Sequence, residues 1–266
     1  MGGLRSTGLQ KKSQAGLPLV TVVTVVLNEV KNLERTINSV LQQSYPNIEL
    51  IVIDGGSAQP TLDVINKFAD KIDYWQSEPD RGIFDAMNKG IALASGEWIN
   101  FLNCGDCFYR NDTVQTVFSQ DHKDADFIYG HTDFQGGDFF GVVKAWGFDI
   151  LWKTMIFTHQ SLFSKTEILK KRNFNTNFCI CADYDLIYNS WKSGLKFYNS
   201  DTVIVSFHPG FSDVSRSRMA WEKWQVVRKH RNDLQFQLFY LQLFLRRLIR
   251  DIINHLSSWL KKRDKL

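Results

Sequence analysis

Short apolar runs along the chain alternate with longer stretches whose apolar residues have helical spacing. The runs at 19–27 and 48–53 are dominated by Val, Ile and Leu, which is typical of parallel strands buried on both faces. Ile83, Met87 and Ile91 recur at i, i+4 and i+8, which places them on one face of a helix. The pattern therefore predicts both element types within the first hundred residues.

The order of these elements indicates the fold class. Strands are expected at 19–27, 48–53, 74–77 and 98–102, and helices after residue 29, at 61–69 and from 83 to about 94. Strands that alternate with helices predict an α/β fold, a mostly parallel sheet flanked by helices. The second half is less regular, with strands expected at 126–129, 139–144 and 203–207.

Composition places the chain among ordinary globular proteins. It has 266 residues, 44% hydrophobic and 23% charged, enough for one large or two small domains. Residues 1–18 are polar and Gly-rich and lack an apolar core of signal-peptide length, which predicts a disordered lead-in. The four cysteines fit reduced thiols of a cytoplasmic protein better than a zinc site, because Cys179-x-Cys181 is unusual zinc spacing.

Two of the predicted strands end in acidic residues. Asp54 follows the strand at 48–53, and Asp106 follows the strand at 98–102 by a short loop. In open α/β sheets, ligands bind at the carboxyl ends of strands. A hard divalent cation such as Mg²⁺ or Mn²⁺ prefers oxygen ligands and, together with substrate phosphates, needs only one or two protein carboxylates, which makes Asp106 a candidate ligand. No dinucleotide or P-loop glycine motif is present.

Several segments, in order, resemble the inverting family 2 glycosyltransferases of the GT-A fold, of the polysaccharide and cell-surface glycan assembly type. They read VTVVTVVLNE at 20–29, ELIVIDGGSAQPT at 49–61 and WINFLNCGD at 98–106. The resemblance covers roughly 19–212. It implies a GT-A (Rossmann-like) domain at 19–215, with a nucleotide-sugar-binding half at 19–106 and an acceptor half at 107–215.

The resemblance also implies roles on the donor side. Asp54 would contact the nucleoside, and Asp106 would bind the metal ion, with His208 as a second metal candidate. The chain departs from the family pattern at two positions: Asn103 replaces the first acid of the metal motif, and Gly55 stands where a second Asp is common. The other donor-binding candidates are Asn28, Glu29, Arg81, Asp85, Asn88 and Asn103. Asp54 also suits a turn or helix cap, and Arg81 a surface position.

The acceptor side is implied by two further segments. Thr158-His159-Gln160-Ser161 resembles the HQS segment of the family, which places His159 and Gln160 there. The sequence CADYDL at 181–186 resembles the family's DyDL signature, whose first acid, here Asp183, is the catalytic base. A carboxylate suits proton removal from a sugar hydroxyl. Asp185 would contact the acceptor or support the site, whereas a helix cap is the alternative role for Asp183.

The C-terminal residues 216–266 form a predicted helical, basic amphipathic tail. Charged residues interrupt any apolar run long enough to cross a bilayer. A helix with a basic face and a Trp suits the surface of an anionic membrane, which predicts a peripheral position at the cytoplasmic membrane face. The alternative is packing on the rest of the chain or in a homo-oligomer. No nucleic-acid-binding motif accompanies the basic residues, so no nucleic acid partner is expected.

The sequence, through this resemblance, thus predicts a transferase that moves a sugar from a nucleoside-diphosphate sugar to a saccharide or lipid-linked saccharide. The donor expected first is a UDP-sugar. Two other interpretations stay open. One is a catalytically silent nucleotide-binding or assembly protein of the same fold. The other is a nucleotidyltransferase, which normally carries a Gly-rich phosphate loop that this chain lacks.

Overall fold

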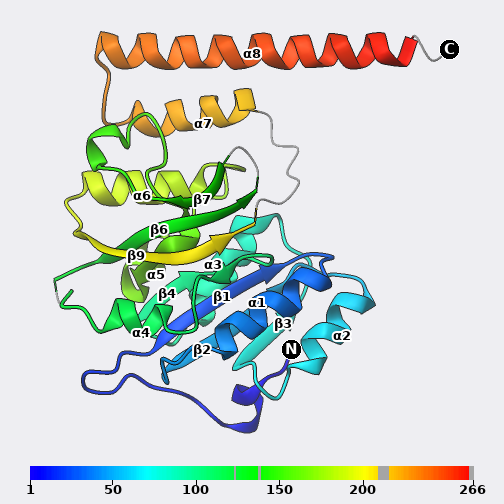
Figure 1. Ribbon diagram of the computed structural model, residues 1–266, viewed down its shortest axis with the longest axis vertical. Helices are drawn as coiled ribbons and strands as arrows, with labels where there is room; N and C mark the ends of the chain where they lie inside the picture. Colours follow the sequence, from blue (N-terminus) through cyan, green and yellow to red (C-terminus); the bar gives the residue numbers. More distant parts are fainter. Residues whose placement is uncertain (123, 137–138, 209–215, 264–266) are drawn as a thin grey trace. The chain divides into compact units, whose positions relative to one another are not determined.

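The structure is a computed structural model that describes residues 1–122, 124–136, 139–208 and 216–263. Within this part of the chain, nine strands form one sheet in the order β3-β2-β1-β4-β8-β6-β9-β5, and β7 pairs with β6 (Figure 1). The strands are β1 (Val20–Val26), β2 (Ile48–Asp54), β3 (Tyr74–Ser77), β4 (Trp98–Phe101), β5 (Cys107–Phe108), β6 (Phe127–Gly136), β7 (Phe139–Val143), β8 (Leu162–Lys165) and β9 (Phe197–Phe207).

The helices follow the strands along the chain. They are α1 (Lys31–Leu41), α2 (Gln59–Lys67), α3 (Ile83–Leu93), α4 (Thr113–Phe118), α5 (Thr166–Arg172), α6 (Ala182–Lys192), α7 (Arg216–Val227) and α8 (Leu234–Arg263). Short 3₁₀ turns occupy η1 (Leu4–Thr7), η2 (Phe148–Ile150) and η3 (His159–Ser161). The chain folds into two compact units: Met1–Phe174 with Gly194–Gly210, which holds the whole sheet, and a second unit that holds α6, α7 and α8.

The parallel half of the sheet confirms the alternation predicted from the sequence. β3, β2, β1 and β4 run parallel, and every residue of β1 and β2 is buried. One face of β1 packs on α1, because Val22 shares a core cluster with Leu33 and Ile37. On the other face α3 lies so close that a Cβ at Gly90 would be 2.4 Å from Val23 Cγ1. Burial on both faces explains the continuous apolar runs.

The second half contains more strand than the sequence predicts. β6 extends to Gly136 and β9 begins at Phe197, although the pattern indicates strands only at 126–129 and 203–207. β8 was not expected at all. The extra residues of β6 include three buried polar ones, His131, Thr132 and Asp133, whereas most of the extra residues of β9 are partly or fully exposed. The register of β6 with β9 also shifts near His131. Strand residues that are polar or partly exposed form no continuous apolar run, so the apolar pattern does not reveal them.

The first residues of the chain pair with the edge of the sheet. Gly2 and Trp75 exchange backbone hydrogen bonds of 2.9 and 3.0 Å. Arg5 donates to the Leu93 carbonyl at 2.8 Å and forms an ion pair with Glu49. The structure therefore gives part of 1–18, expected as a disordered lead-in, defined contacts with the sheet. The polar composition of this segment does not reveal these contacts, because the ion pair of Arg5 with the buried Glu49 of β2 provides much of the binding to the sheet.

Glu49 is a buried carboxylate with several donors. It accepts from Thr21 Oγ1 at 2.6 Å and from the Ser95 backbone N–H at 2.9 Å, and also from Arg5 and the Ser95 hydroxyl. Burial alone would raise the pKa of Glu49, but the hydrogen bonds from Ser95, Thr21 and Arg5 outweigh it and lower the pKa. The ionised form therefore stabilises the folded state.

We expect Glu49→Ala to lower the free energy of unfolding at pH 7 by about 3 kcal/mol, because it leaves Arg5 and its neighbours without their acceptor. Since the folded pKa is depressed, this contribution is full above the unfolded pKa of about 4.3 and is lost as the pH falls through the folded pKa. Urea unfolding at pH 7 and at about pH 3 measures both effects. Glu34→Ala, which removes an exposed ion pair with Lys67, is the control and should cost under about 1 kcal/mol. An equal loss at both pH values would contradict the ionised role.

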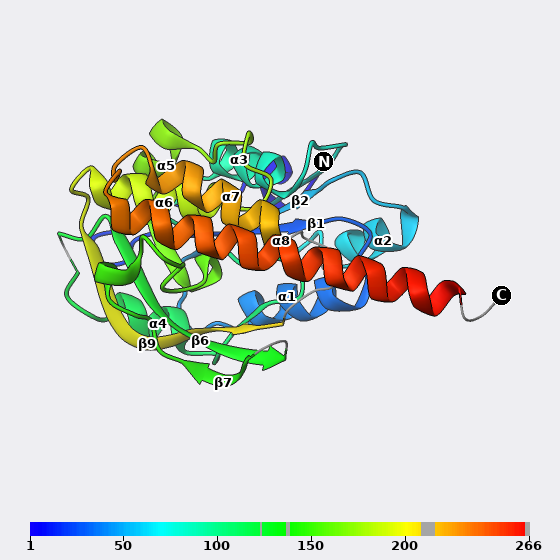
Figure 2. The same cartoon turned by 90° about the horizontal axis from the view of Figure 1, so that it is seen from above.

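The helices α6, α7 and α8 make up most of the second unit. α7 and α8 lie side by side in both views (Figures 1 and 2). The Trp224 indole donates to Gln237 at 3.3 Å, and Arg247 donates to the Arg216 carbonyl at 3.0 Å. Among the described residues, no helix is both long and apolar enough to cross a membrane. α8 exposes a row of apolar side chains: Leu234, Leu238, Leu241, Leu245, Leu248, Ile249, Ile252 and Ile253.

Candidate functional site

The carboxyl ends of β1, β2 and β4 meet at one edge of the sheet. β1 lies between β2 and β4, with Val26 opposite Asp54 and Val23 opposite Phe101. The chain runs outward from β1 through β2 to β3 and then returns to the other side of β1 with β4. The strand order therefore reverses at β1, which creates the switch point where ligands bind in open α/β sheets. Asn28, in a left-handed conformation with φ 52°, lies two residues after the end of β1.

Asn28 joins the loop after β1 to the loop after β2. Its backbone N–H donates to the Ser57 hydroxyl at 2.7 Å, and its side-chain oxygen accepts from the Ala58 N–H at 2.9 Å. Asn tolerates the left-handed region better than most residues, which explains its place in this turn. The Asn28 amide oxygen is therefore used within the protein.

Asp54 is fully buried and oriented by its own loop. Oδ2 accepts from the backbone N–H groups of Gly56 at 3.2 Å and Ser57 at 3.0 Å, and from the Ser77 hydroxyl at 2.6 Å. Oδ1 is buried and has no hydrogen-bond partner in the described structure. Asp54 thus caps its turn with Oδ2 and keeps Oδ1 as a second acceptor. An unpaired buried acceptor lowers the stability of the fold unless a ligand forms a hydrogen bond to it.

The loop after β4 is held by α1. Gly105 has φ +107°, which favours glycine, and its N–H donates to the Thr36 hydroxyl at 3.0 Å. That hydroxyl donates in turn to the Asp106 carbonyl at 2.8 Å. The Arg35 guanidinium donates to the Gly105 carbonyl. Three contacts with α1 therefore fix this loop, in which Asn103 stands at the position of the first acid of the family motif.

The Asp106 side chain is buried between the two halves of the sheet. Oδ2 accepts from Gln160 Nε2 at 3.0 Å, and Oδ1 accepts from the His208 backbone N–H at 3.0 Å. Burial raises the pKa of Asp106 to about 6, while the bond from His208 and the charge of His159 oppose the rise. The carboxylate is ionised at neutral pH but poorly solvated, which favours a cation as its neighbour.

The turn η3 brings two further predicted residues to this loop. The Asn100 amide fixes the turn by donating to the carbonyls of Gln160 at 2.8 Å and Leu162 at 3.0 Å. His159 Nε2 then lies 3.0 Å from Asn103 Nδ2. His159 and Gln160, which the sequence assigns to the acceptor side, thus contact the same loop as the metal candidates.

These residues fit a divalent cation in part. Asn103 Oδ1 and His208 Nδ1 are buried without hydrogen-bond partners in the described structure. Burial lowers the pKa of His208, with a further contribution from Arg35, so the imidazole is neutral and able to bind a metal. The described residues contain no cluster of three or more acidic, His or Cys ligands. One carboxylate and two neutral ligand atoms without hydrogen-bond partners suit an ion whose other ligands come from phosphate and water.

The remaining donor candidates have mostly internal partners. Arg81 is exposed and pairs with Asp85 at 3.0 Å along α3. Asn88 exchanges two hydrogen bonds with the Phe174 backbone, of 2.9 and 2.8 Å. The Glu29 carboxylate accepts a long bond of 3.5 Å from the Asn32 N–H. The structure thus brings Asp54, Asn103 and Asp106 to the strand ends and gives Asn88 a role in holding a loop.

In the second unit, Asp183 lies in the first turn of α6. One carboxylate oxygen accepts from the Tyr184 N–H at 2.7 Å. The buried Glu222 of α7 fixes the preceding segment, accepting from the N–H groups of Cys179 at 3.2 Å, Ile180 at 2.9 Å and Cys181 at 3.0 Å.

Two side chains of the same unit hold the Asp185 carboxylate in place. It is buried and accepts from Asn189 at 2.9 Å and from Lys229 at 3.1 Å. Sequence patterns give no sign that Glu222 or Lys229 would support these carboxylates, because the pairs lie about 40 positions apart in the chain.

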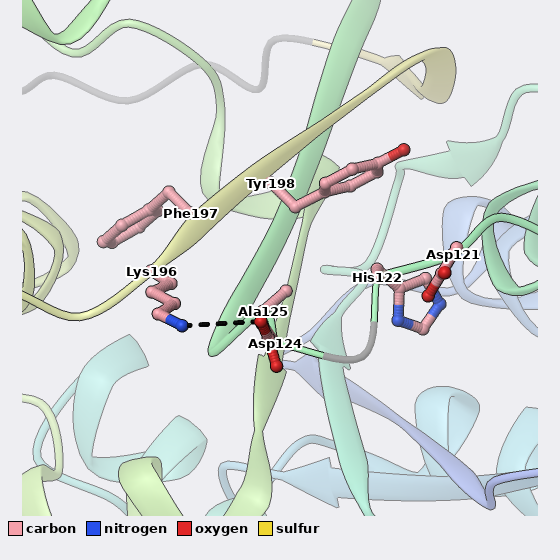
Figure 3. A pocket seen from close by; sticks show the side chains of 7 residues that line it. All are labelled: Asp121, His122, Asp124, Ala125, Lys196, Phe197 and Tyr198. Carbon is pink, nitrogen blue, oxygen red and sulfur yellow. Dashed lines mark ion pairs between the residues drawn. The ribbon is translucent and has the colours of Figure 1, made fainter.

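Two cavities lie away from these strand ends. Their volumes are about 480 and 520 Å³, and they share Asp121 and His122 near the opposite end of β4. Figure 3 shows the first, with the ion pair of Lys196 and Asp124 at 3.6 Å across its wall. None of the residues predicted from the sequence lines either cavity. A smaller cavity of about 190 Å³ adjoins the carboxyl end of β1.

The chain is similar in sequence to curated glycosyltransferases. A PGL/p-HBAD biosynthesis glycosyltransferase of Mycobacterium bovis (strain BCG / Pasteur 1173P2) is 28% identical over 211 residues, which cover 75% of this chain and 80% of that protein. An uncharacterized glycosyltransferase of Mycobacterium tuberculosis (strain ATCC 25618 / H37Rv) is 35% identical over 182 residues, covering 64% and 68%.

Solved structures share the fold. Staphylococcus aureus TarS 1-349 in complex with UDP superposes with a TM-score of 0.64 at 17% identity, covering 85% of this chain and 70% of that one. The mannosyltransferase PcManGT from Pyrobaculum calidifontis, in complex with GDP-Man and Mn²⁺, gives 0.61 at 19% identity, covering 85% and 69%. These likenesses confirm the predicted GT-A fold class.

The family model described as glycosyl transferase family 2 matches residues 21–184. This segment contains the carboxyl ends of β1, β2 and β4 and the start of α6. Together with the relatives, it shows that the chain is a glycosyltransferase and belongs to glycosyl transferase family 2.

Proposed function

We propose that this enzyme transfers a sugar from a nucleoside-diphosphate sugar to a hydroxyl of a saccharide or lipid-linked saccharide, with inversion at the anomeric carbon. The observation that carries the proposal is the pair of buried carboxylates, Asp54 and Asp106, held at strand ends on either side of β1. Structural neighbours bind UDP, UDP-GlcNAc and GDP-Man, which supports a donor of this class.

The sheet unit provides the donor side. Asp54 Oδ1 accepts a hydrogen bond from the nucleoside. Asp106, with Asn103 and His208, would hold Mg²⁺ or Mn²⁺, and the neighbour with Mn²⁺ supports this choice. A bound cation neutralises the leaving diphosphate as a Lewis acid. Arg35, whose guanidinium lies at the Gly105 carbonyl, adds positive charge beside the same loop.

Asp183 is the proposed general base. It removes the proton from the acceptor hydroxyl as the hydroxyl oxygen forms a bond to the anomeric carbon and the bond to the diphosphate breaks. Attack from the face opposite the leaving group inverts the configuration. The bond from the Tyr184 N–H orients the carboxylate at the start of α6, and the sequence CADYDL supports its assignment.

Glu222 is a positioning residue for this base. We expect Glu222→Ala to lower kcat about a hundredfold, because the segment before Asp183 loses its acceptor and small displacements of a catalytic group are costly. Steady-state kinetics and titration of the donor measure the effect, and donor affinity should stay within about twofold of the wild type, since Glu222 does not belong to the sheet unit. Glu167→Ala, an exposed residue on α5, is the control. A parallel loss of donor binding would contradict this role.

We further propose that α8 contacts an anionic membrane surface, where a lipid-linked acceptor would lie. Its exposed row of apolar side chains supports this proposal. The helix sequence 234–263 contains six Lys and Arg residues and one acid, Asp251, which complements anionic lipid. Packing of the same row against a second copy of the chain is the alternative.

The test is release of nucleoside diphosphate from UDP-, GDP- and dTDP-sugars, with and without Mn²⁺ and a membrane extract as acceptor source. Release from one donor, dependent on Mn²⁺ and on the extract, is the expected result. Release of pyrophosphate would instead identify a nucleotidyltransferase. Binding of a nucleotide without turnover of any donor would identify a silent assembly protein.

A further inference from the structure

The second compact unit carries an excess of positive charge. Residues 175–193 and 216–253 of this unit contain ten Lys and Arg residues but five Asp and Glu residues. Three of these acids, Asp185, Glu222 and Asp233, already form ion pairs with cations of the same unit. The unit therefore favours an anionic ligand over a cationic one.

Two cations of this unit, Lys223 of α7 and Arg247 of α8, share one surface. Arg216, Met219 and Lys223 are spaced i, i+3 and i+7, so they lie on one face of α7. The Arg247 guanidinium donates to the Arg216 carbonyl at 3.0 Å, and its Nη1 lies 3.8 Å from Met219 Sδ. Arg247 therefore packs over the face of α7 that carries Lys223.

The same face of α7 adjoins the start of α6. The Cys181 thiol donates to the Met219 carbonyl at 3.7 Å. Lys223 Nζ lies 5.4 Å from the centre of the Tyr184 ring, and Tyr184 directly follows the proposed base, Asp183. Burial lowers the pKa of Lys223, and the charge of Asp183 opposes part of this decrease. The cation on α7 therefore lies close to the proposed base.

Neither Lys223 nor Arg247 has a carboxylate partner in the described part of the chain. Lys223 contacts an aromatic ring, and Arg247 contacts a carbonyl and a thioether. Both side chains are half-buried, and burial lowers the pKa of each, with the charge of Arg247 adding to the decrease at Lys223. Two partly desolvated cations that repel each other lower the stability of the fold unless an anion binds to them. A guanidinium and an ammonium group together suit the oxygens of a phosphate group.

We propose that Lys223 and Arg247 bind a phosphate group of the acceptor. With the accepting hydroxyl at Asp183, this phosphate must be attached close to that hydroxyl, as in a short saccharide linked to a lipid through a diphosphate. Leu248 and Ile249, which follow Arg247 on α8, are exposed and suit the lipid chain. The proposal rests on the proposed function and adds to it the acceptor class, a saccharide that carries a phosphate or diphosphate ester near the accepting hydroxyl.

The test is calorimetric titration of the full chain with farnesyl diphosphate, a soluble prenyl diphosphate, and separately with farnesol and inorganic pyrophosphate. EDTA is present, so that no metal ion joins the diphosphate to the loop at Asp106. Wild type should bind farnesyl diphosphate at least about tenfold more tightly than either fragment. Lys223→Gln and Arg247→Gln should each weaken its binding about 10- to 100-fold, because each removes a charge-assisted hydrogen bond.

Arg246→Gln is the matched control, because it removes the same charge from the adjacent, exposed position of α8. It should leave the affinity for farnesyl diphosphate within about twofold of the wild type, since an exposed charge outside the site is screened. Lys223→Arg and Arg247→Lys keep the charges and should retain most of the affinity. Thermal unfolding of every variant checks that a loss of binding is not a loss of folding.

The outcomes separate the possible sources of the phosphate. Equal losses in Arg246→Gln and Arg247→Gln would overturn the proposal, because the protein would then respond to its net charge, as it would on vesicles of phosphatidylglycerol. Binding of pyrophosphate as tight as that of farnesyl diphosphate would also overturn it, because the site would then hold a free anion.

Failure of the proposed function would be visible separately, because these titrations contain no sugar donor. A wild type that releases no nucleoside diphosphate from any donor would overturn the proposed function. A wild type that releases one, but binds farnesyl diphosphate no more tightly than farnesol, would overturn only the role of Lys223 and Arg247.

Discussion

Asp183→Asn is expected to lower kcat about a thousandfold while donor affinity stays unchanged. General-base catalysis contributes about 10²- to 10⁴-fold, and an amide cannot remove the acceptor proton. Asn still accepts the hydrogen bond from the Tyr184 N–H, so the start of α6 keeps its conformation. The loss should therefore fall on the chemical step, without a matching change in stability.

The measurement is single-turnover release of nucleoside diphosphate, together with titration of the donor. Asp185→Asn is the control from the same helix, because its carboxylate is already bonded to Asn189 and Lys229. That variant should lower the melting temperature more than it lowers kcat. If Asp183→Asn kept wild-type kcat, the base would have to be sought elsewhere and the silent assembly hypothesis would gain support.

The parallel half of the sheet was predictable because its signal is local. β1 and β2 are buried along their whole length, so Val, Ile and Leu dominate their sequences. Asp54 ends β2, and the loop with Asp106 follows the buried strand β4, so the polar residues after these apolar segments are visible in the sequence. The fold class places ligand binding at the carboxyl ends of the strands, which is why these two carboxylates are functional candidates.

The partners of these carboxylates were not predictable, because they come from distant parts of the chain. Gln160 reaches Asp106 from 54 positions away, and the His208 N–H reaches it from 102.

Asn103 tests how far the metal loop depends on its missing acid. Asn103→Asp restores a second carboxylate beside Asp106 and should lower the Mn²⁺ concentration for half-maximal activity about tenfold, because acidic oxygen ligands strengthen binding of hard cations. Asn103→Asp should thus raise metal affinity, whereas Asp106→Asn should lower it, and titration of activity with Mn²⁺ measures both effects.

Asp106→Asn is expected to lower kcat/KM about a hundredfold or more at Mn²⁺ concentrations that saturate the wild type. Asp106 is the one carboxylate that the structure places in this loop, buried and oriented by Gln160 and His208. Without its charge the cation is held by neutral donors only, and neutralisation of the leaving diphosphate weakens. Titration of activity with Mn²⁺ should show a higher half-saturation concentration, partly rescued at high metal. An unchanged metal dependence would mean that the cation, if the reaction needs one, binds without Asp106.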